Sequence, residues 1–230
     1  LIYNTISLSL YQLMIGFPIP IVLALLINEI QSDKLKKTVQ NITYIPHFRS
    51  VVVVVSMLNL FSNVDYGIFN AFFGLFGAEP VDYMAKAQYF QTLYVFSTVW
   101  QMMGFNSIIY IAALTAIDST LYEAATLDGC SRFQKIIHIS LPGLLPTILI
   151  LFIMRMGSIM EIGFEKVLLM QNPINSSRAE IISTFIYKNG IQKGQFSYSA
   201  AVGLFNALIN FFLLVVSNSI VKKYTKTGLW

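Results

Sequence analysis

Long apolar segments without charged residues dominate the pattern along this chain. Three of them run from residue 1 to 28, from 87 to 117 and from 194 to 221. Each is longer than the roughly 20 residues that a helix needs to cross the hydrocarbon core of a bilayer. Only helices and closed barrels satisfy their backbone hydrogen bonds in lipid, and these segments are too long for barrel strands. The pattern therefore predicts an all-α integral membrane protein.

We expect about five transmembrane helices, over roughly 2–30, 44–64, 88–117, 142–163 and 198–221. The first is interrupted at Gly16–Pro20, where two prolines remove backbone donors and produce a kink. The second span is short. Only 15 uncharged residues separate Arg49 from Asp65, which is about 22 Å of helix. This helix spans the bilayer only if it begins near Tyr44, with the Arg49 side chain reaching the headgroups.

Short helices are expected outside the spans, on both sides of the membrane. One external segment follows the second span, and another lies between the fourth and fifth spans. In the latter, Ser177 and Glu180 have the spacing of a capping box, which predicts a helix through Tyr187. The chain begins inside an apolar segment without an initiator Met, so we expect residues 1–230 to be a single transmembrane domain that lacks an upstream N-terminal helix.

Composition excludes a soluble globular protein. Hydrophobic residues make up 56% of the chain and charged residues only 11%, whereas soluble domains carry about 25% charged residues. The mean hydropathy of +0.66 agrees with this exclusion.

The distribution of positive charge predicts the orientation. Nine of the fifteen basic residues fall in three regions on one side of the predicted spans: Lys34, Lys36, Lys37 and Arg49, then Arg132 and Lys135, then Lys222, Lys223 and Lys226. The positive-inside rule places these regions in the cytoplasm, together with the loop 118–141 and the C-terminus. The lone Cys130 lies on the same side, so no disulfide is expected.

The loop 118–141 carries the most specific pattern in the sequence. Asp118 offers an N-cap oxygen to a short polar helix. Ala124 and Ala125 have small side chains, so another backbone could approach that side of the helix closely. Gly129 can adopt the positive φ with which many helices end, a left-handed exit. Further along, Pro142 is expected to begin the fourth span. From these residues alone, the loop could be a plain connection between two spans or an element that docks into another protein.

This loop resembles the EAA loop of the permease subunits of binding-protein-dependent ABC importers. Glu123-Ala124-Ala125, Gly129 and Ile139-Ser140-Leu141-Pro142 match that motif in order and spacing, although Ser119 replaces a proline that is often found there. Gly16–Pro20, Phe164–Leu169 and Gln195–Leu204 are similar to segments of the maltose-type subgroup, which imports oligosaccharides and polysaccharides.

The resemblance implies a type I ABC importer permease core (MetI-like) that forms half of the translocation pathway of an ATP-driven carbohydrate importer in the bacterial plasma membrane. The loop would couple closure of the ATPase to alternating access, through Glu123, Ala124, Ala125, Leu127, Asp128, Gly129, Leu141 and Pro142.

The implied partners are a second permease subunit in a heterodimer, two ATPase subunits, an extracytoplasmic sugar-binding lipoprotein, an oligosaccharide substrate and membrane lipid, but no nucleic acid. The sequence has no phosphate-binding P-loop motif, so we expect ATP and Mg²⁺ on the ATPase subunits, no cofactor on this chain and no enzymatic activity of its own.

Candidates for the substrate pathway are polar and aromatic residues within the spans, because a polar group in lipid is costly unless it faces a cavity. The candidates are Trp100, Gln101, Phe105, Asn106, Arg155, Ser158 and Glu161. Arg155 could bind the substrate or pair with a carboxylate of the second permease. His47 and His138 have no metal-ligand spacing, so we expect no metal site.

Three alternatives come from other functional classes. A membrane-embedded enzyme would need metal-ligand spacing or a nucleophile with its base, and His47 and His138, which are remote in sequence, provide neither. An ion-coupled secondary transporter would need a buried carboxylate at mid-depth and usually repeated halves, and neither feature is evident in the sequence. A membrane interaction subunit without transport activity would not need the loop motif.

Overall fold

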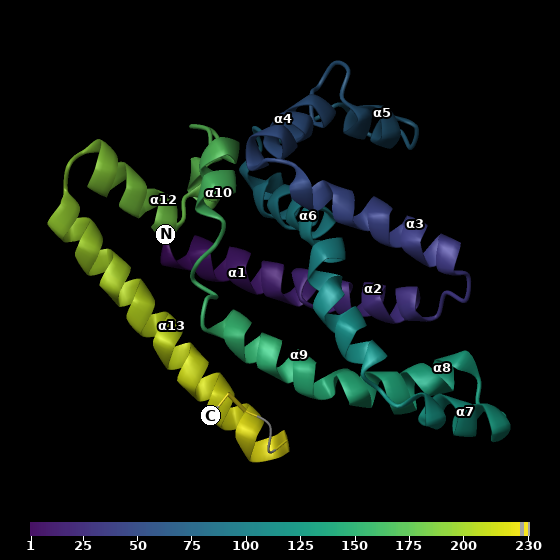
Figure 1. The fold of residues 1–230 in the computed structure, drawn as a ribbon. Helices are drawn as coiled ribbons and strands as arrows, with labels where there is room; N and C mark the ends of the chain where they lie inside the picture. Colours follow the sequence, from purple (N-terminus) through teal and green to yellow (C-terminus); the bar gives the residue numbers. More distant parts are fainter. Residues whose placement is uncertain (226–227, 230) are drawn as a thin grey trace. The chain divides into compact units, whose positions relative to one another are not determined.

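The computed structural model describes residues 1–225 and 228–229, and every regular element among them is helical (Figure 1). Lys226, one of the basic residues assigned to the cytoplasmic side, lies outside the described residues. The α-helices are α1 (Ile2–Gly16), α2 (Pro18–Asn28), α3 (Asp33–Tyr44), α4 (Val51–Phe61), α5 (Ile68–Gly74), α6 (Ala87–Thr115), α7 (Ser119–Leu127), α8 (Arg132–Lys135), α9 (Leu141–Met156), α10 (Phe164–Met170), α11 (Ser176–Ala179), α12 (Ile182–Ile186) and α13 (Phe196–Thr225). Shorter turns η1 (Ile45–Phe48), η2 (Ile136–Ser140) and η3 (Tyr187–Gln192) extend α3, α8 and α12.

Three helical segments among the described residues are long and apolar enough to cross a membrane: Ile2–Asn28, Arg132–Met156 and Phe196–Thr225. The number rises to five if α3 with α4, and α6 with α7, each count as one bent span. The prediction of an all-α membrane protein is confirmed, and the expected break in the first span lies at Phe17, between α1 and α2.

The second and fourth spans differ from their predicted limits. The helical run of the second begins at Asp33, where Ser32 caps α3, instead of near Tyr44, and it is interrupted between Phe48 and Val51. The fourth begins at Arg132 instead of Pro142, because the wide π-helical turn η2 joins α8 to α9. A wide turn suits this position, since Pro142 has no amide hydrogen for a regular helix. The span ends at Met156, seven residues before the predicted Gly163.

The chain divides into two compact units. Unit 1 contains residues 1–15, 49–99 and 159–210, and its buried core includes Leu8, Val54, Val95, Val167 and Ile181. Helix α10 packs against α4 and α12 in this unit.

Polar side chains of α1 bind the segment around α11 and α12 within unit 1. The Asn4 amide donates hydrogen bonds to the carbonyls of Ser177 and Glu180, at 2.9 and 3.0 Å. The amide of Ile182 donates to Thr5 Oγ1 at 3.0 Å. The capping box predicted at Ser177 and Glu180 is therefore wrong: the helix stops at Ala179, and the Glu180 carboxylate pairs instead with Lys188 at 3.1 Å.

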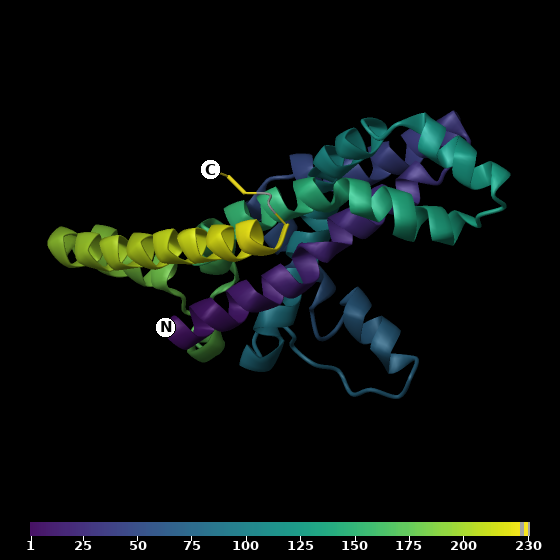
Figure 2. The ribbon, with the colours of Figure 1, turned by 90° about the horizontal axis from the view of Figure 1, so that it is seen from below.

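Unit 2 contains residues 16–48, 100–158 and 211–230. Its core joins α2, the second half of α6 and α9 through Ile21, Ala24, Tyr110, Leu114 and Leu144. Helix α3 approaches α6 closely, since a Cβ at Gly104 would overlap the backbone carbonyl of Thr43. Helices α7 and α8 lie side by side at one end of this unit, as two views show (Figures 1 and 2).

Candidate functional site

Helix α7 begins with a side-chain cap, as the sequence predicts. Asp118 Oδ1 accepts a hydrogen bond from the backbone amide of Thr120 at 2.9 Å. This bond satisfies one of the free amides in the first turn of the helix. Because the amide stabilises the charged carboxylate, it holds the pKa of Asp118 below its ordinary value.

The other end of α7 has the two hydrogen bonds of a Schellman motif. The amide of Cys130 donates to the carbonyl of Ala125 at 2.9 Å, and that of Gly129 donates to Thr126 at 3.1 Å. Gly129 has a φ of +76°, which is unfavourable for residues with a Cβ. The predicted left-handed exit at Gly129 is confirmed, and it fixes where the helix ends.

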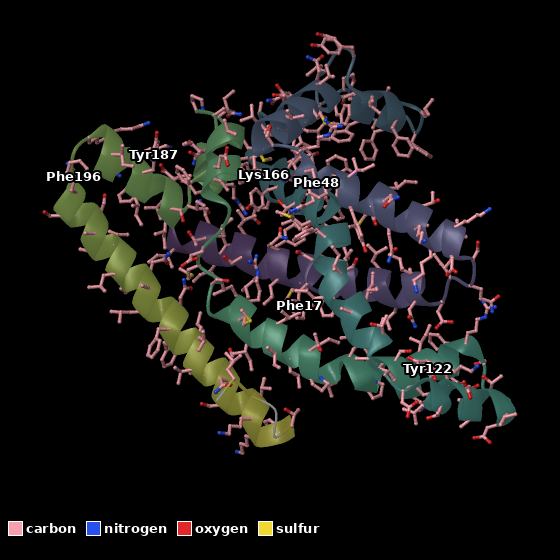
Figure 3. The ribbon with its side chains drawn as sticks, viewed as in Figure 1. Phe17, Phe48, Tyr122, Lys166, Tyr187 and Phe196 are labelled. Atoms are coloured by element: carbon pink, nitrogen blue, oxygen red, sulfur yellow. The ribbon has the colours of Figure 1, made fainter. Side chains whose placement is uncertain are left out.

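Side chains attach α7 to the segment that leads into α9. The Tyr122 hydroxyl lies 2.9 Å from Ser140 Oγ, on η2 (Figure 3). Lys135 Nζ, at the end of α8, donates to Thr126 Oγ1 at 2.7 Å. The capping box of Ser131 and Gln134 fixes the start of α8. These contacts hold α7, α8 and η2 together as one protruding unit, residues 118–140, called the knob below. A displacement of α7 would therefore be transmitted to the start of α9.

Most of the residues predicted to couple to the ATPase are exposed on this knob. Leu127 is 90% exposed, so its apolar side chain is available to a partner. Among them only Ala125 is buried. The exposed members are Glu123, Ala124, Leu127, Asp128, Gly129, Leu141 and Pro142. Helix α7 and the residues that follow it therefore expose apolar and acidic side chains to a partner, as does the start of α9.

Two of the predicted pathway residues share a cavity of about 160 Å³ within unit 2. Asn106 on α6 and Arg155 on α9 line it, together with Phe17 and Pro20 at the start of α2 and with Tyr110 and Leu151. An edge-to-face contact with Phe152, 5.7 Å between ring centroids, supports the Phe17 ring. The cavity thus combines one cation, one amide and two aromatic rings without a carboxylate.

The other pathway candidates have different surroundings. The Phe105 ring stacks on His47, with 3.8 Å between centroids. Trp100 is 41% exposed, while Gln101 is buried. The Ser158 hydroxyl donates to carbonyls of its own helix end. Glu161 belongs to unit 1, where its carboxylate accepts a hydrogen bond from Asn210 at 3.4 Å.

The sequence interpretation did not single out Phe17, Tyr110 or Lys166. Phe17 is the aromatic residue of the break between α1 and α2, which the sequence did show. Its position beside Asn106 could not be predicted, because it depends on how α2, α6 and α9 pack. Lys166 is 5% exposed, and its Nζ donates to Thr98 Oγ1 at 3.0 Å and lies 5.5 Å from the centre of the Tyr94 ring (Figure 3). Helix α10 lies outside the candidate spans, and burial lowers the pKa of Lys166 to about 7.

Comparison with known proteins identifies one family across almost the whole chain. Residues 2–226 match the family described as "Binding-protein-dependent transport system inner membrane component". Two proteins of Bacillus subtilis (strain 168) resemble the chain over its full length. The polygalacturonan/rhamnogalacturonan transport system permease protein YteP is 42% identical, and Protein LplB is 39% identical, with 72% of each relative covered.

Solved structures agree with this match. A chain of a bacterial alginate ABC transporter, in complex with an alginate pentasaccharide-bound periplasmic protein, superposes with a TM-score of 0.94 at 39% identity. The superposition covers 98% of this chain and 78% of that chain. A second structure, of a bacterial ABC transporter involved in the import of the acidic polysaccharide alginate, gives a TM-score of 0.92 at 38% identity and covers 96% of this chain and 78% of that chain.

Proposed function

Because this chain belongs to the family of binding-protein-dependent transport system inner membrane components, we propose that it is a permease subunit forming half of the translocation pathway of an ATP-driven carbohydrate importer. The observation that carries the proposal is the knob at α7. It is capped at both ends, attached to α9 and exposed at the residues of the EAA motif. These are the properties of an element that transmits motion from a partner.

Helix α7 would act as a rigid lever. In this mechanism two ATPase subunits close on ATP and Mg²⁺, which they bind, and one of them holds the segment Glu123–Gly129. Leu127 and the slim face at Ala124 would enter a cleft of the ATPase. Its closure would shift α7, and the bonds from Tyr122 and Lys135 would pass the shift to η2 and α9.

The relatives support a carbohydrate as substrate. Among them are transporters whose names specify polygalacturonan and rhamnogalacturonan, alginate and arabinooligosaccharides. The cavity of α2, α6 and α9 supports a place for part of such a chain, since aromatic rings stack on sugar rings and amides match hydroxyl groups. Its 160 Å³ is below the roughly 300–1,000 Å³ of pockets for drug-sized ligands. We infer that a second permease supplies the rest of the pathway.

The remaining partners follow from the same proposal. A second permease pairs with this chain as a heterodimer, and an extracytoplasmic sugar-binding lipoprotein delivers the oligosaccharide. The loop 118–141 and the C-terminus lie in the cytoplasm, where the ATPase subunits can reach α7. The basic residues of α8 and of the end of α13 support this orientation.

Two substitutions on α7 test the lever, in the complete importer reconstituted into proteoliposomes. Gly129→Asp and Glu123→Lys are each expected to lower sugar uptake per ATP hydrolysed by about tenfold or more, since both alter the face that would enter the ATPase. The measurement is the ratio of the uptake rate to the ATPase rate, together with membrane insertion.

Matched controls exist outside the loop. Gly77 has a φ of +80°, and neither Gly77 nor Gly129 has an atom within 4 Å of an added Cβ. Gly77→Asp therefore introduces the same backbone strain far from α7 in sequence, and Glu79→Lys reverses an exposed charge in the same region. Both controls should keep the native ratio. Unchanged coupling in Gly129→Asp and Glu123→Lys would refute the lever.

A further inference from the structure

Arg155 is a cation without an anionic partner among the described residues of this chain. Glu180, for example, pairs with Lys188 at 3.1 Å and not with Arg155. Arg155 is exposed on the last turn of α9 and lines the cavity of unit 2. A guanidinium stays protonated in proteins, so it cannot become neutral by releasing its proton. Within a membrane protein such a charge is costly unless an anion or water meets it.

The walls around Arg155 are suited to a sugar ring that carries a negative charge. The half-buried Phe17 ring offers an apolar surface, and the Asn106 amide offers both a donor and an acceptor. No carboxylate lines the cavity, so its net charge is positive. Arginine binds carboxylates through two parallel hydrogen bonds, and this geometry favours a planar carboxylate over a neutral hydroxymethyl group.

We propose that Arg155 binds the carboxylate of an acidic sugar unit, a uronate, as the oligosaccharide passes through the cavity of α2, α6 and α9. This inference rests on the proposed carbohydrate importer and names its substrate class. The cavity has room for only part of a chain, so one uronate at a time would occupy it. If Arg155 only formed an ion pair with a partner subunit, it would need neither a cavity nor an aromatic ring and an amide lining that cavity.

The test compares two sugars and three variants in the complete importer in proteoliposomes. The probes are a mixture of galacturonate di- to hexasaccharides and the same mixture with its carboxylates reduced to alcohols. Arg155→Gln removes the charge and keeps hydrogen-bonding capacity, whereas Arg155→Lys keeps the charge. Arg178→Gln, at an exposed arginine of unit 1, is the matched control.

The native importer is expected to take up the acidic mixture faster than the reduced one. Arg155→Gln should slow uptake of the acidic mixture by about tenfold or more, because a charge-assisted hydrogen bond is lost. Arg155→Lys should restore most of that uptake, and Arg178→Gln should match the native importer. The permease pair should remain intact in all variants on size-exclusion chromatography.

Three results would overturn the inference. They are equal uptake of both mixtures by the native importer, no effect of Arg155→Gln on acidic uptake, and dissociation of the permease pair in Arg155→Gln, which would identify a subunit ion pair. In each case uptake of reduced or other neutral sugars would leave the proposed carbohydrate importer standing. A native importer that takes up no sugar of either kind would contradict both.

Discussion

At the scale of the residue, two cations of this chain have unusual surroundings. Arg155 faces a cavity, and Lys166 is enclosed between α10 and α6 with a hydroxyl and a ring as neighbours. The sequence revealed Arg155 because a single cation within an apolar run is conspicuous. It did not reveal that Lys166 is buried, because a short external segment with a lysine is usually solvated.

The pKa of Lys166 gives a test of its burial. Burial lowers that pKa from 10.5 to about 7, so between these values the unfolded chain binds one more proton than the folded chain at this site. Stability should therefore rise with pH above about 7, by up to ~1.4 kcal/mol per unit. Below pH 7 both states are protonated, and the full cost of the buried charge remains.

The measurement is thermal unfolding of the purified protein in detergent from pH 6 to 9. Lys166→Met should remove this part of the pH dependence and be most stabilising at the acidic end. Lys86→Met, at an exposed lysine, should follow the native curve. A Lys166→Met curve parallel to the native one at all pH values would show that Lys166 is solvated.

At the scale of the element, apolar patterning predicted which segments are helices but not where tertiary contacts break them. The first, third and fifth spans lie close to their predicted limits. A long uncharged segment in lipid must form a helix, because its backbone hydrogen bonds cannot otherwise be satisfied. The capping box at Ser177 failed because the helix begins at Ser176 and ends at Ala179, and the Glu180 carboxylate pairs with Lys188. The start of the fourth span was misplaced because the π-helical turn η2 carries the helix past Pro142.

The approach of α3 to α6 depends on one glycine. A methyl group at Gly104 would overlap the Thr43 carbonyl, which is backbone and cannot rotate away. Gly104→Ala should therefore force α3 from α6 and destabilise the protein by about 1–3 kcal/mol. Thermal unfolding in detergent measures the change. Gly203→Ala on α13 has open space around the added methyl and should stabilise the helix by up to about 1 kcal/mol; equal effects of the two substitutions would contradict close packing at Gly104.

At the scale of the whole molecule, family membership and the α7 knob could be recognised from sequence, because the EAA motif is local and its spacing is specific. The cavity could not, because Phe17, Asn106 and Arg155 come from three helices whose packing no local pattern specifies. The sequence indicated Asn106 and Arg155 separately as candidates for the substrate pathway, and only the fold shows that they line the same cavity. The central claim is that motion enters this chain through α7.

Site-specific photo-crosslinking from α7 tests that claim most directly. A photoreactive phenylalanine analogue replaces Leu127, which is 90% exposed, or Tyr66, which is 68% exposed and belongs to unit 1 as the control. In the assembled, transport-active importer, position 127 is expected to capture the ATPase subunit with high yield and position 66 to capture none. Capture of the ATPase from position 66, or its absence at position 127 in an active complex, would contradict the account.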